Sequence, residues 1–372
     1  PYTGLSTTLE ATWNGSPSVK KDALRELNPN FTFIVSVFYR EGSFVGDEDT
    51  ITDLWKFGDY PPDSPFWIRD EAGEPVPAFG RDDNLDGTIQ PEEIQLVLVD
   101  FRNPDLIELI AQKALILDQS GVVDGIFLDW WSERHRTAGS FLDWEEFYMT
   151  LEEEVEARLA ILRRIRELVS DDFLIVGNTN QWTAPLSAPY MNGMFMESVK
   201  ADMFSGYTTQ ELQTIEESLY WGSENLREPR VSCLEGWRVV YNYAETDHDA
   251  QISERNSEEN QRQMRLVTTL SLTHSDSNVV FGADPVEAHA HNWYEFWDAD
   301  LGQAVGPKRT TYQGIEGLFI REFTNGYAVY NRSGSVQEVT FDREYQAVSQ
   351  AHTGNAHLVP NMDGEIFLAS LQ

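Results

Sequence analysis

The sequence has few of the residues on which several classes of protein depend. Its 372 residues include a single cysteine, Cys233, which excludes an internal disulfide and a cysteine-based zinc site. No apolar run is long enough to span a membrane, and no low-complexity tract stands out. Apolar and aromatic residues are nevertheless ample for a core. The length therefore fits one large domain with a small second domain attached.

Positive charge is also scarce, because 27 basic residues face 62 acidic ones and give a formal charge of −35. Such a surface repels nucleic acid and anionic membranes, so we expect neither as a partner. It suits salt- or calcium-rich water, which screens self-repulsion. The chain starts at Pro1 rather than Met, so we expect that an upstream piece was removed or left out. These features predict a secreted, cell-surface or periplasmic protein of bacterial type, and they leave its oligomeric state open.

The most informative stretch runs from 122 to 131. Ile126, Phe127 and Leu128 form a short apolar run that predicts a strand buried on both faces. The run stops at Asp129, which Trp130 and Trp131 follow. An acid at the carboxyl end of a buried parallel strand lies where α/β barrels place their chemistry, and flat indoles beside it could support a sugar ring. The alternative is a helix N-cap beside two core tryptophans.

Similar runs recur along the chain and predict its fold. Strands are expected near residues 7, 31, 94, 125, 173, 193, 231 and 278, with helical segments between most of them. This alternation predicts an α/β fold, a (β/α)8 TIM barrel over residues 1–305. After Gly306 the pattern changes to short strands joined by Asn-Gly, Ser-Gly and Asp-Gly turns. We expect a small C-terminal antiparallel β-sandwich domain at 306–372.

A calcium loop is expected within a long insertion at about 42–93. Residues 82–93 match the calcium-loop pattern position by position. The predicted oxygen ligands are Asp82, Asn84, Asp86, Thr88 through its carbonyl, and Glu93 in bidentate fashion. A structural Ca2+ bound there would brace an insertion that has little core of its own. The alternative is an acidic surface turn.

Acidic residues end several of the predicted strands at one face of the barrel: Asp100, Asp129, Glu197, Glu235 and Asp284. We expect Asp100 and Asp284 to be helix caps or ion-pair partners, which leaves Asp129, Glu197 and Glu235 as catalytic candidates. Candidate substrate-binding residues surround them: Trp130, Trp131, Arg134, His135, Asn178, Asn180, Trp182, Trp237 and Tyr241. Carboxylates with aromatic and amide side chains, but without a histidine cluster, indicate a carbohydrate site. Glycosidic cleavage needs one protonated and one ionised carboxyl group.

Several short motifs carry a resemblance to known proteins. They are Val99-Asp100-Phe101-Arg102-Asn103-Pro104, the later Asp124-to-Asp129 strand, Phe66-Trp67-Ile68-Arg69-Asp70 with Gly73, and Gly326-to-Asn331. Together they resemble (β/α)8-barrel glycosyl hydrolase families predicted from bacterial genomes, with distant similarity to endo-α-1,4-polygalactosaminidases and the α-galactosidase clan. In those relatives the acid that ends the fourth strand is the nucleophile, and one near the sixth strand is the acid/base. By position, the resemblance implies these roles for Asp129 and Glu197. The calcium loop is absent from that pattern, so the substrate is not carried over.

The leading hypothesis is therefore a retaining glycoside hydrolase that cleaves a polysaccharide or oligosaccharide. A variant of it pairs Asp129 with Glu235. A second hypothesis is a non-catalytic carbohydrate-binding barrel, in which the carboxylates accept hydrogen bonds. A third is a polysaccharide lyase, although lyases usually rely on a Tyr, His or Lys base, and the strand ends here carry acids.

Overall fold

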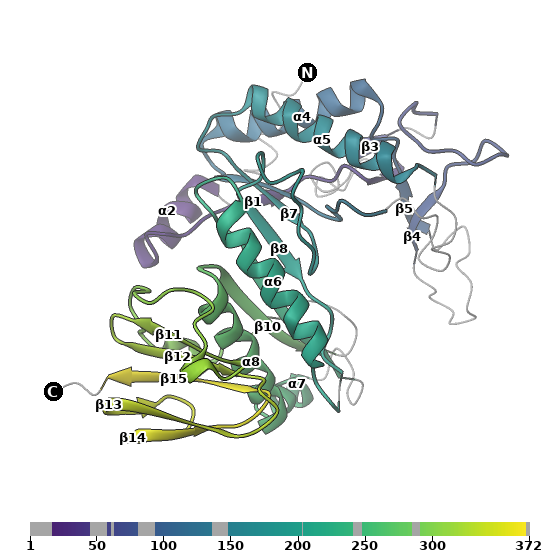
Figure 1. Ribbon diagram of the computed structural model, residues 1–372. Coiled ribbons are helices and arrows are strands. Elements are labelled where there is room, and N and C mark those ends of the chain that lie inside the picture. Colours follow the sequence, from purple (N-terminus) through teal and green to yellow (C-terminus); the bar gives the residue numbers. More distant parts are fainter. Residues whose placement is uncertain are drawn as a thin grey trace. The chain divides into compact units, whose positions relative to one another are not determined.

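The chain forms two compact units in its computed structural model. The structure describes residues 17–44, 58–60, 63–80, 94–135, 148–202, 204–240, 248–284 and 291–369. Unit 1 comprises Pro1–Thr179, Ala184–Gly193 and Leu226–Pro229, and unit 2 comprises Asn180–Thr183, Met194–Asn225 and Arg230–Gln372. Each unit is described by itself below (Figure 1).

Unit 1 contains three parallel strands that alternate with helices. The central strand β6 (Gly125–Leu128) pairs with β1 (Ile34–Ser36) on one side and with β7 (Leu174–Asn178) on the other. Helix α4 (Pro104–Ser120) leads into β6, and α5 (Leu151–Leu168) connects β6 to β7. Parallel neighbours joined through a helix are the βαβ arrangement that the sequence predicts.

Local signals set the ends of these elements. Asn103 caps α4 by accepting a hydrogen bond from the Asp105 amide at 2.9 Å, and Pro104 is the first helical residue. Helix α2 (Pro17–Leu27) is tied to the turn before β6, because Lys21 and Arg25 both contact the Asp124 carboxylate, at 2.8 and 2.9 Å.

A second sheet in unit 1 corrects one expected barrel strand. Its strand order is β3 (Gly58–Tyr60), β2 (Glu41–Phe44), β5 (Ile94–Leu98) and β4 (Pro77–Gly80). Strand β5 runs antiparallel to both of its neighbours. The strand expected near residue 94 therefore exists but belongs to this mixed sheet and not to the parallel one.

Unit 2 also contains three parallel strands, β8 (Gly193–Glu197), β9 (Cys233–Val239) and β10 (Asn278–Asp284), with β9 paired to both others. Helix α6 (Thr209–Asn225) connects β8 to β9. Helices α7 (His248–Arg255) and α8 (Glu258–His274) connect β9 to β10. Strand β9 lies very close to α8, because a Cβ added at Gly236 would lie 2.5 Å from Val267. Glu235, the preceding residue, therefore faces away from α8.

The C-terminal residues form one antiparallel sheet. Its strand order is β11 (Leu318–Phe323), β12 (Gly326–Asn331), β15 (Asp363–Ala369), β13 (Gln337–Ala347) and β14 (His352–Val359). Its core includes Leu318, Val329, Val359 and Phe367. Helix α8 packs against β11, β12 and β15 on one side and against β9 and β10 on the other (Figure 1). Four of these strands lie where the sequence predicts them, but β14 was not predicted, and the expected Asp-Gly turn at Asp363 is the start of β15. In the described residues the strands make one sheet backed by a helix, where a sandwich was expected.

Six of the eight expected barrel strands are present as parallel strands, three in each unit. The strand expected near residue 7 and the calcium loop at 82–93 lie outside the described residues. The closed (β/α)8 barrel stays a prediction. Within the described parts of the chain, every helix is too short or too polar to cross a membrane.

Candidate active site

Asp129 follows the last residue of β6, where the carboxyl ends of the parallel strands meet. Its Oδ1 accepts hydrogen bonds from the Trp130 amide at 2.8 Å and from Asn178 Nδ2 at 2.9 Å. The strand register explains the second bond, because Leu128 pairs with Gly177 and the next residues therefore lie side by side. No helix begins between residues 130 and 135, so the N-cap alternative is not observed. Asp129 is a half-buried carboxylate fixed by two donors.

A buried ion pair lies close to Asp129. Arg40 and Glu41 are 3% and 4% exposed and contact each other directly. Burial raises the pKa of Glu41, the Arg40 guanidinium opposes this rise, and the charge of Asp129 adds to it. The guanidinium of Arg40 also lies over the Trp130 ring, 4.7 Å from its centroid. The surroundings of Asp129 thus combine a second acid, a fixed cation and an indole.

A chain of buried polar groups supports the backbone beside Asp129. Tyr39 donates its hydroxyl proton to the Trp130 carbonyl at 2.7 Å and accepts a hydrogen bond from Arg158 at 2.9 Å. Arg158 binds Glu154 at 2.8 Å, and Glu154 lies 3.2 Å from His135. Tyr39, Arg158 and Glu154 are at most 1% exposed. This group, which we call the Tyr39 relay, connects α5 to the residue after Asp129.

The two consecutive tryptophans lie in different surroundings. Trp130 has a left-handed backbone with φ of 52°, which turns the chain. Its ring stays half-buried beneath Arg40. Trp131 is completely buried, packs 5.1 Å from Tyr39 and donates to Ser187 at 3.1 Å. The expectation that Trp131 binds substrate is therefore wrong in this structure, where it is a core residue.

Unit 2 brings the other two catalytic candidates together. Glu197, at the end of β8, is the register partner of Glu235 on β9. Aligned residues of neighbouring parallel strands lie about 5 Å apart and point to the same face. The half-buried Glu197 and the fully buried Glu235 therefore share the face opposite α8. Asn180 donates to the Glu197 carbonyl at 3.1 Å and so fixes the end of the strand.

Glu235 has a histidine partner that the sequence analysis missed. Its Oε1 lies 2.5 Å from Nε2 of His291, which is 33% exposed. His291 is brought there by an antiparallel bridge to Gly282 of β10. The only sequence signal for this contact would have been a histidine shortly after the last of the predicted barrel strands. Beside it, burial raises the pKa of Cys233 to about 12, so this thiol stays protonated and is not a nucleophile.

Trp237 is buried rather than open to a ligand. It is 2% exposed and donates to the Ser198 carbonyl at 2.8 Å. Tyr207 exchanges two hydrogen bonds with its backbone, and Lys200 lies 4.5 Å from its ring centroid. This corrects the expectation that Trp237 is an open platform. Trp182, in contrast, is half-buried.

The other residues predicted for the site lie at the surface, have structural partners, or lie outside the described residues. Arg134 is exposed, and His135 is engaged by Glu154. Asp100 is paired with Arg102 at 2.8 Å, which confirms its expected ion-pair role. Tyr241, the side chain of Asp284 and the calcium ligands Asp82, Asn84, Asp86, Thr88 and Glu93 lie outside the described residues. Within the part of the chain that is described, no group of three or more His, Cys, Asp or Glu side chains could hold a metal ion.

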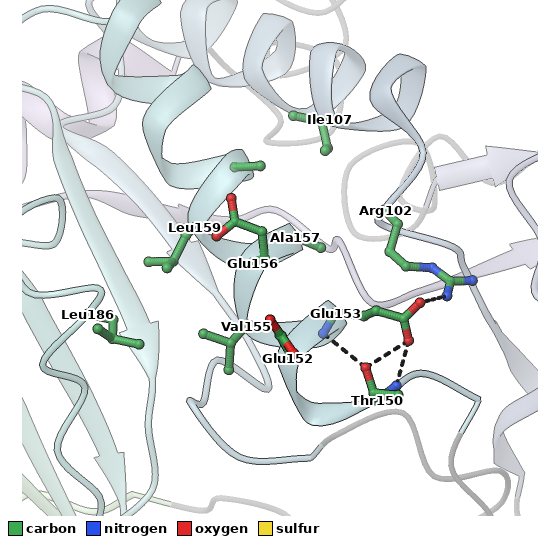
Figure 2. Close-up of a pocket in the computed structure, with 11 residues that line it drawn as sticks. Arg102, Ile107, Thr150, Glu152, Glu153, Val155, Glu156, Ala157, Leu159 and Leu186 are labelled. Carbon is green, nitrogen blue, oxygen red and sulfur yellow. Dashed lines mark hydrogen bonds and ion pairs between the residues drawn. The ribbon is translucent and has the colours of Figure 1, made fainter.

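An open cavity of about 840 Å³ lies elsewhere in unit 1, between α4 and α5 (Figure 2). Thr150 and Glu153 form the capping box of α5 at its edge, and Arg102 binds Glu153 at 2.9 Å (Figure 2). Asp129 is not among its lining residues. Because Asp129 does not line it, and Thr150, Glu153 and Arg102 serve the helix end, this cavity is not the candidate site.

Comparison with known proteins gives similarity at the level of solved structures alone. No protein-family model matches the sequence, and no curated protein matches it either. An Anoxybacillus α-amylase is 11% identical with a TM-score of 0.47, over 95% of this chain and 79% of that one. A maltogenic α-amylase from Thermotoga neapolitana is 12% identical with a TM-score of 0.47, over 96% and 82%. The trehalose-6-phosphate hydrolase of Bacillus licheniformis is 10% identical with a TM-score of 0.46, over 95% and 86%.

These three proteins are glycoside hydrolases, but similarity this low assigns no activity to the present chain. The resemblance to polygalactosaminidases and to the α-galactosidase clan stays a prediction.

Proposed function

We propose that this chain is a retaining glycoside hydrolase that cleaves a polysaccharide or oligosaccharide. The observation that carries the proposal is the setting of Asp129 at the end of β6. Both donors to its carboxylate, Asn178 and the Trp130 amide, bind the same oxygen, Oδ1. Oδ2 is then the oxygen presented for attack on the anomeric carbon. An ionised carboxylate held in one orientation is what a nucleophile of this kind requires.

The proposed mechanism has two steps. In the first, Asp129 attacks the anomeric carbon while Glu197 protonates the departing glycosidic oxygen, which leaves a covalent glycosyl–Asp129 ester. In the second, Glu197 takes a proton from water, and that water displaces Asp129 from the sugar. Retention requires the two carboxyl groups to be about 5–5.5 Å apart, and inversion about 6.5–9.5 Å. A ligand complex that shows the wider separation would replace this mechanism with an inverting one.

Glu235 is the alternative acid/base, and one observation favours it. It is fully buried and bound to His291, a group able to exchange protons with it. Glu197, its register neighbour, is half-buried at the very end of its strand. Glu197 keeps the leading role because the end of a strand is closer to the expected position of the substrate.

Two further proposals accompany the activity. The first is a structural Ca2+ held by the loop Asp82 to Glu93, supported by the match of its sequence to the calcium-loop pattern. The second is a secreted, cell-surface or periplasmic location, supported by the formal charge of −35.

The test of the activity is a panel of neutral and acidic polysaccharides, assayed for released reducing ends and for the ultraviolet absorbance of an unsaturated product. We expect reducing ends without unsaturation, and a loss of at least about a thousandfold in kcat for Asp129→Asn. Asp105→Asn, an exposed first-turn residue of α4, is the matched control and should keep full activity. Unsaturated product would indicate a lyase. Binding without any product would indicate a carbohydrate-binding barrel.

A further inference from the structure

A second cavity in unit 2 lies away from the strand ends that carry the proposed catalytic acids. Its volume is about 510 Å³, and it is bounded by the start of β10, by α8, by the 3-10 helix η2 (Glu295–Asp298) and by the C-terminal sheet. Asn278 lines it and is the first residue of β10. Asp284 ends that strand six residues later, so the two ends are roughly 20 Å apart along the strand. The cavity is therefore separate from the proposed catalytic face.

An exposed indole forms one wall of this cavity. Trp293 is 66% exposed, and its Nε1 donates to Asp298 at 2.9 Å. Its ring meets Trp297 edge to face, with centroids 5.7 Å apart. Trp297 is itself fixed by a 2.9 Å hydrogen bond to Thr268 of α8. Trp293 is thus a rigid aromatic surface held open to solvent, which is the form aromatic side chains take at binding sites.

The polar groups around the indole limit the kind of ligand. Asn278 and Gln303 supply amides, and Asp300 supplies an exposed carboxylate that is oriented by a 3.1 Å hydrogen bond from Gly302. The described residues that line the cavity include no Lys or Arg, and Asp298 adds a second negative charge beside Trp293. Anionic ligands are repelled by such a lining. A neutral sugar fits it, because a pyranose ring has an apolar face for the indole and hydroxyl groups for amides and carboxylates.

We propose that this cavity is an auxiliary binding site for a neutral glycan, with Trp293 as its stacking platform. The site holds a polysaccharide chain on the face of unit 2 formed by η2 and the C-terminal sheet, and its ligand is not cleaved there. The inference does not rest on hydrolysis, because it concerns binding without turnover.

The test is native affinity electrophoresis in gels that contain soluble starch, dextran or barley β-glucan, with polygalacturonate as the anionic probe. We expect retardation in at least one neutral gel and none in polygalacturonate. Trp293→Ala should raise the dissociation constant about tenfold, and Gln303→Ala should raise it less. Phe204→Ala, which removes another exposed aromatic ring, should migrate as the unmodified protein does.

Two comparisons separate this site from the proposed catalytic one. Asp129→Asn should be retarded as strongly as the unmodified protein, and Trp293→Ala should keep any hydrolysis of short oligosaccharides. Retardation that is unchanged by Trp293→Ala, absent from all three neutral gels, or strongest in polygalacturonate would overturn the proposed binding site. None of these results bears on Asp129, whose test is product release.

Discussion

Glu197 and Glu235 are register neighbours in different surroundings, and this difference makes their roles separable. An acid/base residue is needed least when the leaving group departs without protonation. We predict that Glu197→Gln loses at least about a hundredfold in kcat on a natural glycan but much less on an aryl glycoside with a good leaving group. Glu235→Gln, whose amide can still reach His291, should lose similar activity on both substrates. Steady-state kinetics on the two substrates checks this, and the reverse pattern would move the acid/base role to Glu235.

The Tyr39 relay leads to a second prediction at the residue scale. Tyr39→Phe removes the hydroxyl that binds the Trp130 carbonyl and leaves Arg158 without this acceptor. We expect a loss of about 1–3 kcal/mol in the free energy of unfolding, measured in urea. We also expect a fall in kcat with little change in KM, because the backbone next to Asp129 is less firmly held.

Tyr190→Phe is the matched control, since it removes the hydroxyl of a half-buried tyrosine elsewhere in unit 1. It should change neither the free energy of unfolding nor kcat by much. A Tyr39→Phe protein that is destabilised but keeps its full kcat would show that the relay supports folding alone.

Some features of the surroundings of Asp129 could be predicted from the sequence, and others could not. The position of Asp129 at the end of a buried strand follows from an apolar run that stops at an acid, which is a local signal. The different burial of Trp130 and Trp131 could not be predicted in this way, because the positive φ of Trp130 turns the chain between them. The partners Arg40 and Glu41 could be placed near the strand ends, but their proximity to Asp129 depends on how β1 pairs with β6.

At the scale of elements, a buried polar cluster connects α6, α8 and β12. Glu216 of α6 accepts hydrogen bonds from Tyr330 at 2.8 Å and from Arg332 at 2.7 Å. His274, at the end of α8, lies 3.9 Å from Glu216 and is completely buried. Burial lowers the pKa of His274 to about 3, and the charges of Arg309 and Arg332 add to this effect. The Glu216 carboxylate is already engaged by Tyr330 and Arg332.

This cluster predicts acid sensitivity. Between pH 6.5 and 3 the unfolded chain binds a proton at residue 274 that the folded chain excludes, so stability falls as the pH falls. We predict that His274→Gln reduces the slope of unfolding free energy against pH by up to about 1.4 kcal/mol per pH unit between pH 6 and 4. His352→Gln, which removes a histidine of the exposed strand β14, is the control. Urea unfolding at several pH values checks this, and unchanged slopes would mean that His274 titrates normally.

Which elements form could largely be predicted from the sequence, but which of them pair could not. Helix α4 begins where Asn103 and Pro104 indicate, and α8 begins after Ser257, which caps it at 3.2 Å. Strand β5 forms where expected yet pairs with β2 and β4, because the choice of partner depends on residues far away in the chain. The C-terminal sheet is likewise backed by α8, whose Thr269 approaches β15 closely because Gly364 has no Cβ there.

At the scale of the whole molecule, the formal charge of −35 opposes folding by self-repulsion, which salt screens. Any salt should therefore raise the melting temperature to some extent. A bound Ca2+ acts differently, because it stabilises through binding to the folded state and needs only a concentration above its dissociation constant. The two effects can be distinguished by comparing ions at equal ionic strength.

We predict that millimolar Ca2+ raises the melting temperature by several degrees above matched solutions of Mg2+ or NaCl, and that a chelator lowers it again. Asp86→Ala should abolish the calcium-specific part, because it removes a central side-chain oxygen of the loop Asp82 to Glu93, and should keep the general response to salt. Asp105→Ala, which removes one exposed carboxylate elsewhere, should keep both responses. Differential scanning calorimetry measures all three proteins. If Ca2+ stabilises no better than Mg2+, or if Asp86→Ala keeps the full calcium effect, the loop is an acidic surface turn and the stabilisation is screening alone.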